Sequence, residues 1–455
     1  MSLTELDRAH VQQLVERERQ TYRDRNPGSI GLYEAADNLF GRVPMTWMNK
    51  WSGGFPLYLE AAHGNRITDV DGHTYIDFAL GDTAAMAGHS PEASVKAVVQ
   101  RVQDAGGLTT MLPTGDAQWV GAELTRRFGV PLWSFTLTAT DANRWAIRLA
   151  RLATGKSKIL VFAWCYHGSV DEIFAVPGAD GQAVARPGNV APPVALAETT
   201  RVVEFNDLAA LERELAHGDV AAILAEPAMT NIGIVLPEPG FLEGLRELAT
   251  KYGALLMIDE THTFSAGPGG MTKRDNLQPD IFIIGKSIGA GIPSGAYGIT
   301  HEVAAAIQQH PEADLVDVGG VGGTLAGNSL SMAAMRATLG EVLTDEAFEG
   351  MIALCTRYTN QVQELLTQYK MPWSIAQVGA RAEYRFTSPA PTNGTQAMLG
   401  GDELLDEFMH LYMCNRGILM TPFHNMALMC PATTQADVDE HARLFEEALK
   451  DLTGR

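Results

Sequence analysis

Six short apolar runs, separated by segments of helical length, constrain the fold of this chain more than any other feature of its sequence. The runs lie between residues 116 and 325 and read SFTLT, KILVFAW, RVVEF, VAAILAE, ALLMIDE and IFIIGK. Strands that alternate with helices form a mostly parallel sheet, and strands covered on both faces are apolar throughout. We therefore predict a large α/β domain in the middle of the chain.

The segments on either side of this region have a different pattern. Residues 4–23 predict an amphipathic helix that docks as an arm, and LYLEAAHGNRITDVDGHTYIDF predicts two short strands about an Asp-Gly turn. After residue 325, long helical segments, short strands and a final helix at 435–452 indicate a smaller α+β domain. The predicted divisions are an N-terminal arm with a small-domain segment, a large domain and a C-terminal small domain, at 1–77, 78–325 and 326–455.

Composition excludes several classes of partner and compartment. The chain has 34 Lys and Arg against 54 Asp and Glu, a net charge of −20, which disfavours binding to nucleic acid or to an anionic membrane surface. No apolar run approaches the roughly 18 residues of a membrane span, and the charged N-terminal segment is unlike a secretory signal. The four cysteines have neither metal-site nor disulfide spacing, so we expect a cytoplasmic protein without a structural metal.

Polar residues at the carboxyl ends of parallel strands are the first candidates for a ligand site. Lys286 follows the apolar run IFIIG, and Asp259 follows ALLMI. A desolvated lysine paired with a carboxylate suggests pyridoxal phosphate (PLP), which needs a Schiff-base lysine and a carboxylate at its pyridinium nitrogen. The alternatives are that Lys286 extends from its strand end to solvent and that Asp259 caps a turn.

A phosphate site is also required for that cofactor. The segment SFTLTATDANRWAIRLAR predicts a strand, a short turn and a helix whose first residues are Ala139, Thr140 and Asp141. Free N–H groups and the helix dipole attract anions at such a position. An ordinary Thr/Asp N-cap would have the same sequence, so this motif alone leaves both possibilities open.

Several motifs in a fixed order carry a family resemblance. They read TATDANRWAIRLAR, CYHG, EPAMTN, IDET, GKSIGAGIPSGAYG and GGTLAGNSLSM. This order resembles the class III aminotransferases of PLP fold type I, and most closely the glutamate-1-semialdehyde aminomutase-like branch. The resemblance extends from about residue 36 to the C-terminus. It implies a PLP enzyme with a large PLP-binding domain, a smaller α+β domain, and a homodimer with shared active sites.

The resemblance also assigns roles to individual residues. Lys286 would bind the cofactor covalently and carry the proton between substrate and cofactor, while Asp259 would keep the ring nitrogen protonated. Tyr166 in CYHG matches the aromatic residue that stacks on the ring. Asn231 in EPAMTN matches the residue that bonds its phenolic oxygen.

Further matches concern the phosphate and the surrounding loops. Ala139 and Thr140 match the phosphate-binding turn, and Thr324 in GGT matches a threonine that reaches the phosphate of the neighbouring subunit. Glu226 and His167 match motif positions that either support loops or act directly. Ala139 replaces a glycine of the family's turn, so we expect weaker binding of the cofactor.

Three departures from the aminomutase branch concern the substrate. Trp47 stands where an arginine binds the substrate carboxylate, Met426 where a glutamate contacts the amino group, and Thr421 where other class III members have an arginine. These replacements predict a pocket for a less charged substrate. Core packing is the alternative explanation for Trp47 and Met426.

The resulting prediction is a PLP-dependent transaminase that moves an amino group from an amine or hydrophobic amino acid to a keto or aldehyde acceptor. The alternative is an aminomutase, racemase or amino-alcohol lyase on the same scaffold. A third possibility, a binding protein that has lost PLP, is disfavoured because Lys286 and Asp259 are both present. An acceptor carboxylate would need a cation, for which Arg42, Arg381 and His424 are the candidates.

Overall fold

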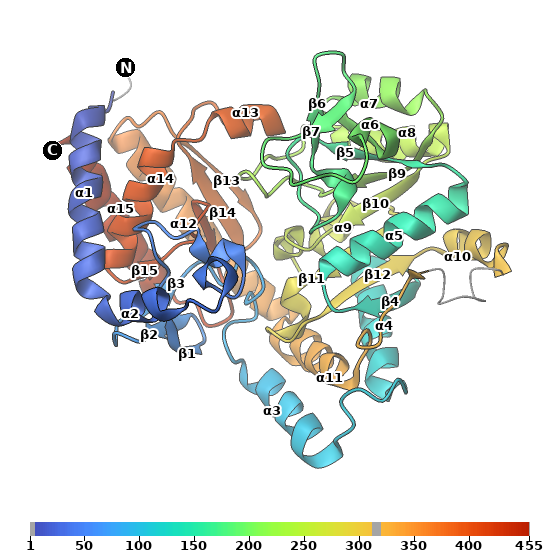
Figure 1. Cartoon of the computed structure of the whole chain (residues 1–455), viewed down its shortest axis with the longest axis horizontal. Helices are drawn as coiled ribbons and strands as arrows, with labels where there is room; N and C mark the ends of the chain where they lie inside the picture. Colours follow the sequence, from blue (N-terminus) through green and yellow to red (C-terminus); the bar gives the residue numbers. More distant parts are fainter. Residues whose placement is uncertain (1–4, 312–319, 455) are drawn as a thin grey trace. The chain divides into compact units, whose positions relative to one another are not determined.

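A computed structural model describes residues 5–311 and 320–454, and contacts divide the chain into two compact units (Figure 1). Unit 1 comprises residues 1–91, 349–390 and 400–455, and unit 2 comprises residues 92–348 and 391–399. These limits fall later in the chain than the predicted ones at 77/78 and 325/326. The second limit is later because α11 (Ser329–Ala337) packs against α3 (Glu92–Gln100) within unit 2.

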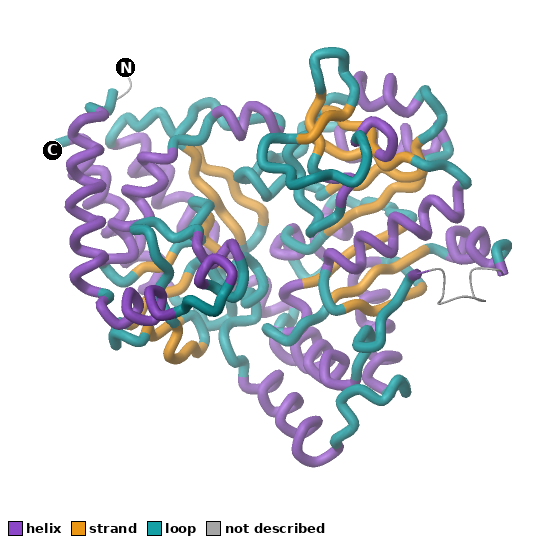
Figure 2. The backbone as a smooth tube through the Cα atoms, viewed as in Figure 1, coloured by secondary structure: helices purple, strands orange, loops and turns teal. Residues whose placement is uncertain are grey.

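The central sheet of unit 2 has seven strands in the order β4-β12-β11-β10-β9-β5-β8. Figure 2 draws the strands in orange, with helices in purple around them. All six apolar runs form strands of this sheet, which confirms the predicted mostly parallel α/β fold. The antiparallel β12, which pairs with both β11 and β4, was not predicted because its sequence GAYGI is rich in glycine. The strand bounds are β4 Leu132–Thr136, β5 Lys158–Phe162, β8 Thr200–Val203, β9 Val220–Ala225, β10 Leu255–Asp259, β11 Ile281–Gly285 and β12 Gly295–Ile299.

Helices pack on this sheet. One of them, α5 (Ala139–Thr154), contacts β4, β9, β11 and β12. The other helices and a two-stranded hairpin of unit 2 are α4 Gly115–Phe128, α6 Leu196–Thr199, α7 Leu208–Leu215, α8 Phe241–Tyr252, α9 Gly270–Arg274, α10 His301–Gln308, α13 Gly394–Leu399, β6 Ala175–Pro177 and β7 Ala183–Ala185. Helix α12 (Asp345–Gln368) crosses the division between the units. Within the described residues, no helix combines the length and the apolarity needed to cross a membrane.

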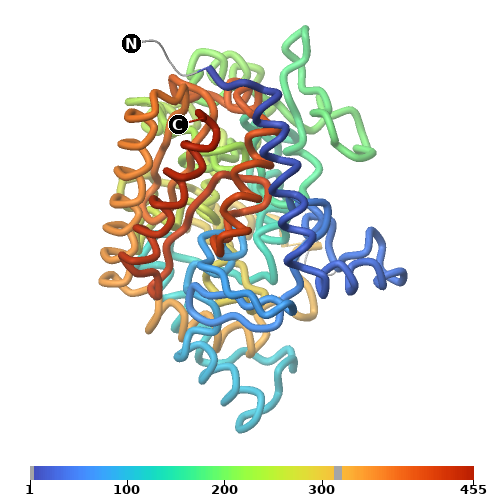
Figure 3. The backbone as a smooth tube through the Cα atoms, turned by 90° about the vertical axis from the view of Figure 1, so that its left-hand side faces the viewer, coloured from blue at the N-terminus to red at the C-terminus, as the bar shows by residue number. Residues whose placement is uncertain are grey.

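Unit 1 contains two small sheets with orders β1-β2-β3-β15 and β13-β14-β16. The predicted Asp-Gly turn joins β2 to β3. Three helices lie side by side here, because α1 packs against α14 and α15 (Figure 3). The bounds are α1 Arg8–Arg25, α2 Pro27–Ala35, β1 Leu59–His63, β2 Arg66–Asp69, β3 Thr74–Asp77, β13 Ser374–Val378, β14 Arg381–Arg385, α14 Glu403–Asn415, β15 Ile418–Leu419, β16 Met426–Leu428 and α15 Gln435–Thr453.

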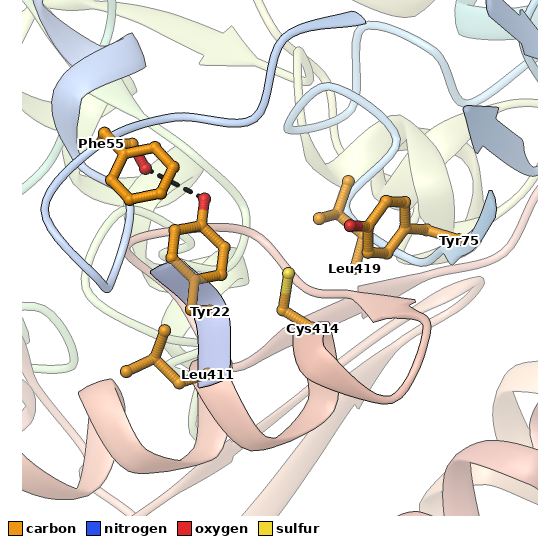
Figure 4. Close-up of a cluster of buried hydrophobic side chains, with 6 residues drawn as sticks. All are labelled: Tyr22, Phe55, Tyr75, Leu411, Cys414 and Leu419. Carbon is orange, nitrogen blue, oxygen red and sulfur yellow. Dashed lines mark hydrogen bonds between the residues drawn. The ribbon is translucent and has the colours of Figure 1, made fainter. Parts of the chain in front are cut away.

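A buried cluster anchors the N-terminal helix of unit 1 (Figure 4). Tyr22 of α1 is 1% exposed and donates a hydrogen bond from its hydroxyl to the Phe55 carbonyl at 3.0 Å. Because this hydrogen bond pairs the Tyr22 hydroxyl, the ring is buried without the free-energy cost of an unpaired polar group. The cluster consists of Tyr22, Phe55, Tyr75, Leu411, Cys414 and Leu419.

Candidate active site

Two neighbouring strands of unit 2 bring the predicted lysine and aspartate to one edge of the sheet. β10 and β11 are parallel, with Asp259 opposite Ile283, so the residues that follow the two strands are neighbours. Lys286 Nζ lies 2.9 Å from Nε2 of His262, which belongs to the loop after β10. Lys286 also has a φ of 52°, in the left-handed region that non-glycine residues seldom adopt. Such strain is found preferentially at functional sites.

Asp259 is buried and held by three hydrogen bonds. Its Oδ2 accepts from Asn143 Nδ2 and pairs with His167 Nδ1, both at 2.9 Å, and its Oδ1 accepts from the Thr261 amide at 3.0 Å. Asn143 is on α5 and His167 follows β5, so three separate elements fix one carboxylate. A fully buried carboxylate with this many partners keeps a single orientation.

The electrostatics of this cluster favour a charged aspartate. Burial alone would raise the pKa of Asp259, but the hydrogen bond and charge of His167, with the bonds from Thr261 and Asn143, hold it below its ordinary value. Burial likewise opposes protonation of His167, yet the Cys165 sulfur and the Asp259 carboxylate together raise the pKa of the imidazole. Both shifts favour the ionic form of the pair, with Asp259 as the anion.

The N-terminus of α5 is closely packed between two glycines. A Cβ built on Gly168 would lie 2.1 Å from Thr140 Oγ1, and one on Gly285 would lie 2.9 Å from both the amide nitrogen and the Cβ of Ala139. Gly168 also has a φ of 82°, so both its conformation and its surroundings require glycine. Where the family's turn has a glycine, this chain has Ala139. The residue that packs against Ala139 is itself a glycine, Gly285.

The other residues predicted near the cofactor are on loops of unit 2. Tyr166 is half-buried, with its ring edge-on to Phe174 at a centroid distance of 6.1 Å. Asn231 donates to the Trp164 carbonyl at 3.2 Å, which ties its loop to the one that precedes Tyr166. Glu226 is buried and accepts a hydrogen bond from Thr230.

Thr324 lies apart from these contacts, on the surface of unit 2. It is exposed and borders a hollow of about 270 Å³ lined by residues 109–113 and 326–329. Two apolar side chains that line the hollow are exposed: Met111 at 80% and Leu112 at 72%.

The predicted substrate residues Trp47, His424 and Met426 belong to unit 1. The ring of Trp47 lies 5.6 Å from that of Phe423, which is 38% exposed. His424 Nδ1 lies 3.2 Å from Glu383 Oε1, and Met426 is fully buried on β16. Met426 therefore packs in the core, which was the alternative to a place in the substrate pocket.

The cations considered for a carboxylate are also in unit 1. Arg381 is buried and donates to Thr83 Oγ1 at 3.1 Å. Arg42 is exposed, donates to the Glu34 carbonyl, and lies 3.7 Å from Asp37. Thr421, at the position of the family's second arginine, is buried.

Sequence reasoning missed two contacts of the site. Asn143 is four residues after Ala139 on α5, a helical spacing that would have placed it on the same face. His262 is three residues after Asp259, in the loop that must adjoin Lys286 if β10 and β11 are neighbours. Only the strand order of the sheet establishes that adjacency.

Comparison with known proteins identifies the family of this chain. The family model of class-III aminotransferases matches residues 47–451. The chain belongs to the class-III aminotransferase family. Its PLP cofactor and fold type I architecture, both expected from the motifs, are thereby confirmed.

Similar members of the family include aminomutases and a transaminase. The glutamate-1-semialdehyde 2,1-aminomutase of Chloroflexus aggregans is 35% identical over 88% of this chain and 92% of its own length. A glutamate-1-semialdehyde-aminomutase structure from Pseudomonas aeruginosa PAO1 is 46% identical with a TM-score of 0.95, covering 99% of this chain and 100% of that one. An omega-transaminase from Sphaerobacter thermophilus is 28% identical with a TM-score of 0.85, covering 95% and 99%.

The residues of unit 2 fit this cofactor. A pyridinium nitrogen needs a buried anion, and Asp259 is one; a phosphate needs free amides, and the N-terminus of α5 offers them.

Proposed function

We propose that this enzyme is a PLP-dependent aminomutase, which moves an amino group between two carbons of one substrate. Its similarity to aminomutases over nearly the whole chain supports this reaction. The transaminase reaction, expected first from the sequence, is thus less well supported than the isomerase alternative. The observation that carries the assignment as a PLP enzyme is that Lys286 and the buried Asp259 lie at the ends of two adjacent parallel strands.

The residues of unit 2 divide the work of binding and proton transfer. Bound PLP supplies an electron sink for the carbanion that forms when the substrate loses a proton. Asp259, oriented by His167 and Asn143, holds a proton at the ring nitrogen, and Lys286 is the base that moves the proton of the substrate. Tyr166 would stack on the ring and Asn231 would bond its phenolic oxygen.

A variant of the Pseudomonas relative supports the role of Lys286. Its structure is of a K286A variant in complex with PMP, and that relative covers this chain almost from end to end. A lysine at the same number in two chains of matching length is consistent with the same position in the fold. PMP is the amine form of the cofactor. A variant in which alanine replaces the attaching lysine is expected to hold this form without a covalent bond.

The proposed substrate is less charged than glutamate-1-semialdehyde. Trp47, in place of an arginine, forms a partly exposed aromatic pair with Phe423. Such a pair favours an alkyl or aryl group, which gains about 1.5–3 kcal/mol on burial, whereas an unpaired carboxylate loses its hydration. We assign Trp47 and His424 to the substrate pocket, and leave Met426 to the core.

We also propose a homodimer with shared active sites. The exposed Met111 and Leu112, together with Leu325 at 49% exposure, surround Thr324, and a contiguous apolar patch is typical of an interface. Sedimentation velocity tests the dimer. Mixing an inactive Lys286→Ala chain with a Thr324→Val chain tests the sharing, since hybrid dimers should regain one intact site. A fully active monomer would contradict the assignment of Thr324.

Turnover without an acceptor tests the reaction class. Holoenzyme is mixed with glutamate-1-semialdehyde, or with neutral amino aldehydes that carry an alkyl or aryl group, and no keto acid is added. An aminomutase forms product in large excess over enzyme, because each substrate both gives and receives the amino group. A transaminase stops after one equivalent with its cofactor converted to the amine form.

A transaminase remains the second candidate function. The similarity to the Sphaerobacter omega-transaminase and the aromatic pair both favour an amine or hydrophobic amino acid donor. A stoichiometric burst with each donor, relieved by pyruvate, would support this reaction instead.

A further inference from the structure

The contact between Lys286 and His262 has no role in the function proposed above. Nζ of Lys286 and Nε2 of His262 are 2.9 Å apart, and both side chains are half-buried. When the lysine is an ammonium, which carries donors only, Nε2 of His262 accepts from it and the ring proton is on Nδ1. In this geometry His262 is a base within hydrogen-bond distance of the lysine amine.

The loop that carries His262 is fixed on both sides of it. The Thr261 amide donates to Asp259 at 3.0 Å, and the Thr263 hydroxyl donates to the buried Glu260. Glu260 in turn accepts hydrogen bonds from the Met271 and Thr272 amides at the start of α9. His262 therefore extends from an anchored turn, which reduces the entropy lost in holding it against Lys286.

The chemistry of a cofactor-binding lysine requires such a base. Only a neutral amine can attack a carbonyl carbon or take a proton from carbon, whereas a free lysine in water is protonated at neutral pH. When a proton leaves Nζ, the N–H bond breaks there and a new N–H bond forms at Nε2 of His262. The imidazole gains the positive charge that the lysine loses, so no other reactant is needed.

We propose that His262 positions the amine of Lys286 and accepts its proton when the amine reacts. The inference rests on the proposed attachment of PLP to Lys286. His262 acts through Lys286, so it is a positioning residue whose loss should slow every step that starts from the free amine.

The test measures how fast PLP attaches to the apoenzyme. Apoprotein is mixed with PLP, attachment is followed by absorbance, and samples are reduced with borohydride and digested to locate the modified lysine by mass spectrometry. The variants are His262→Gln, which can accept a hydrogen bond but takes up no proton, and His262→Ala, to which imidazole is added. His217→Gln is the matched control, because His217 is an exposed histidine of the same unit.

General-base catalysis is worth about 10²–10⁴-fold, so both His262 variants should attach PLP at least about tenfold more slowly than wild type. Added imidazole should restore much of the rate to His262→Ala and change the His217→Gln rate little. Equal rates for wild type and His262→Gln, with both folded by circular dichroism, would refute the proton-accepting role. Modification of wild type at a lysine other than Lys286 would instead refute the proposed function.

Discussion

Gly285 allows β11 to end directly against the start of α5, and replacing it by alanine should disturb both. A Cβ at this position would lie 2.9 Å from the nitrogen and the Cβ of Ala139 and 3.2 Å from its Cα. Two of these three atoms are backbone and cannot rotate away. With a φ of −158° and a ψ of −150°, Gly285 is not in the left-handed region, so most of the effect should come from overpacking.

Overpacking of this kind costs about 1–3 kcal/mol. A domain of about 150–250 residues loses roughly 2–4 °C in melting temperature per kcal/mol, so Gly285→Ala should melt about 2–12 °C below wild type. Because Lys286 follows Gly285 directly, PLP should also bind more weakly, by about tenfold for each 1.4 kcal/mol of misfit.

Thermal melting of the apoprotein and PLP titration provide the measurements. Gly121→Ala is the matched control, since Gly121 is inside α4 with nothing within 4 Å of a built Cβ, and alanine there should stabilise by up to about 1 kcal/mol. Combining Gly285→Ala with Ala139→Gly should recover part of the loss by removing one of the two Cβ atoms. If Gly285→Ala melts within 1 °C of wild type, the close approach of the two elements is wrong.

Three substitutions test the assigned roles. The Lys286→Ala variant should fold and bind PLP, but borohydride reduction should not link PLP to the chain. Turnover above a tenth of wild type would contradict the assignment of Lys286. Asp259→Asn should keep its contacts but lose most of the rate, because a neutral amide cannot hold the ring proton; kcat measured at saturating PLP decides this, and an unchanged value would place the ring partner elsewhere. Trp47→Arg should raise kcat/KM for glutamate-1-semialdehyde relative to neutral substrates, whereas efficient wild-type conversion to 5-aminolevulinate would refute the pocket assignment.

The sequence alone was sufficient for the fold class and for the identity of the cofactor. The six apolar runs are strands because burial on both faces leaves no polar alternation, and that pattern is local. Lys286 and Asp259 stood out as candidates because Lys and Asp are seldom buried, and both follow apolar runs. By contrast, β12 has two glycines in five residues and becomes a strand only by pairing with β11 and β4.

The tertiary structure decided which residues complete the site. His167, Asn143 and the Thr261 amide come from three elements and converge on one carboxylate, and no spacing in the sequence predicts that convergence. The partner of Lys286 depends on β10 and β11 being neighbours, a long-range pairing, and the place of Met426 in the core depends on β16 joining β14. Local sequence determines what a segment can become, but contacts between distant segments depend on how the chain packs as a whole.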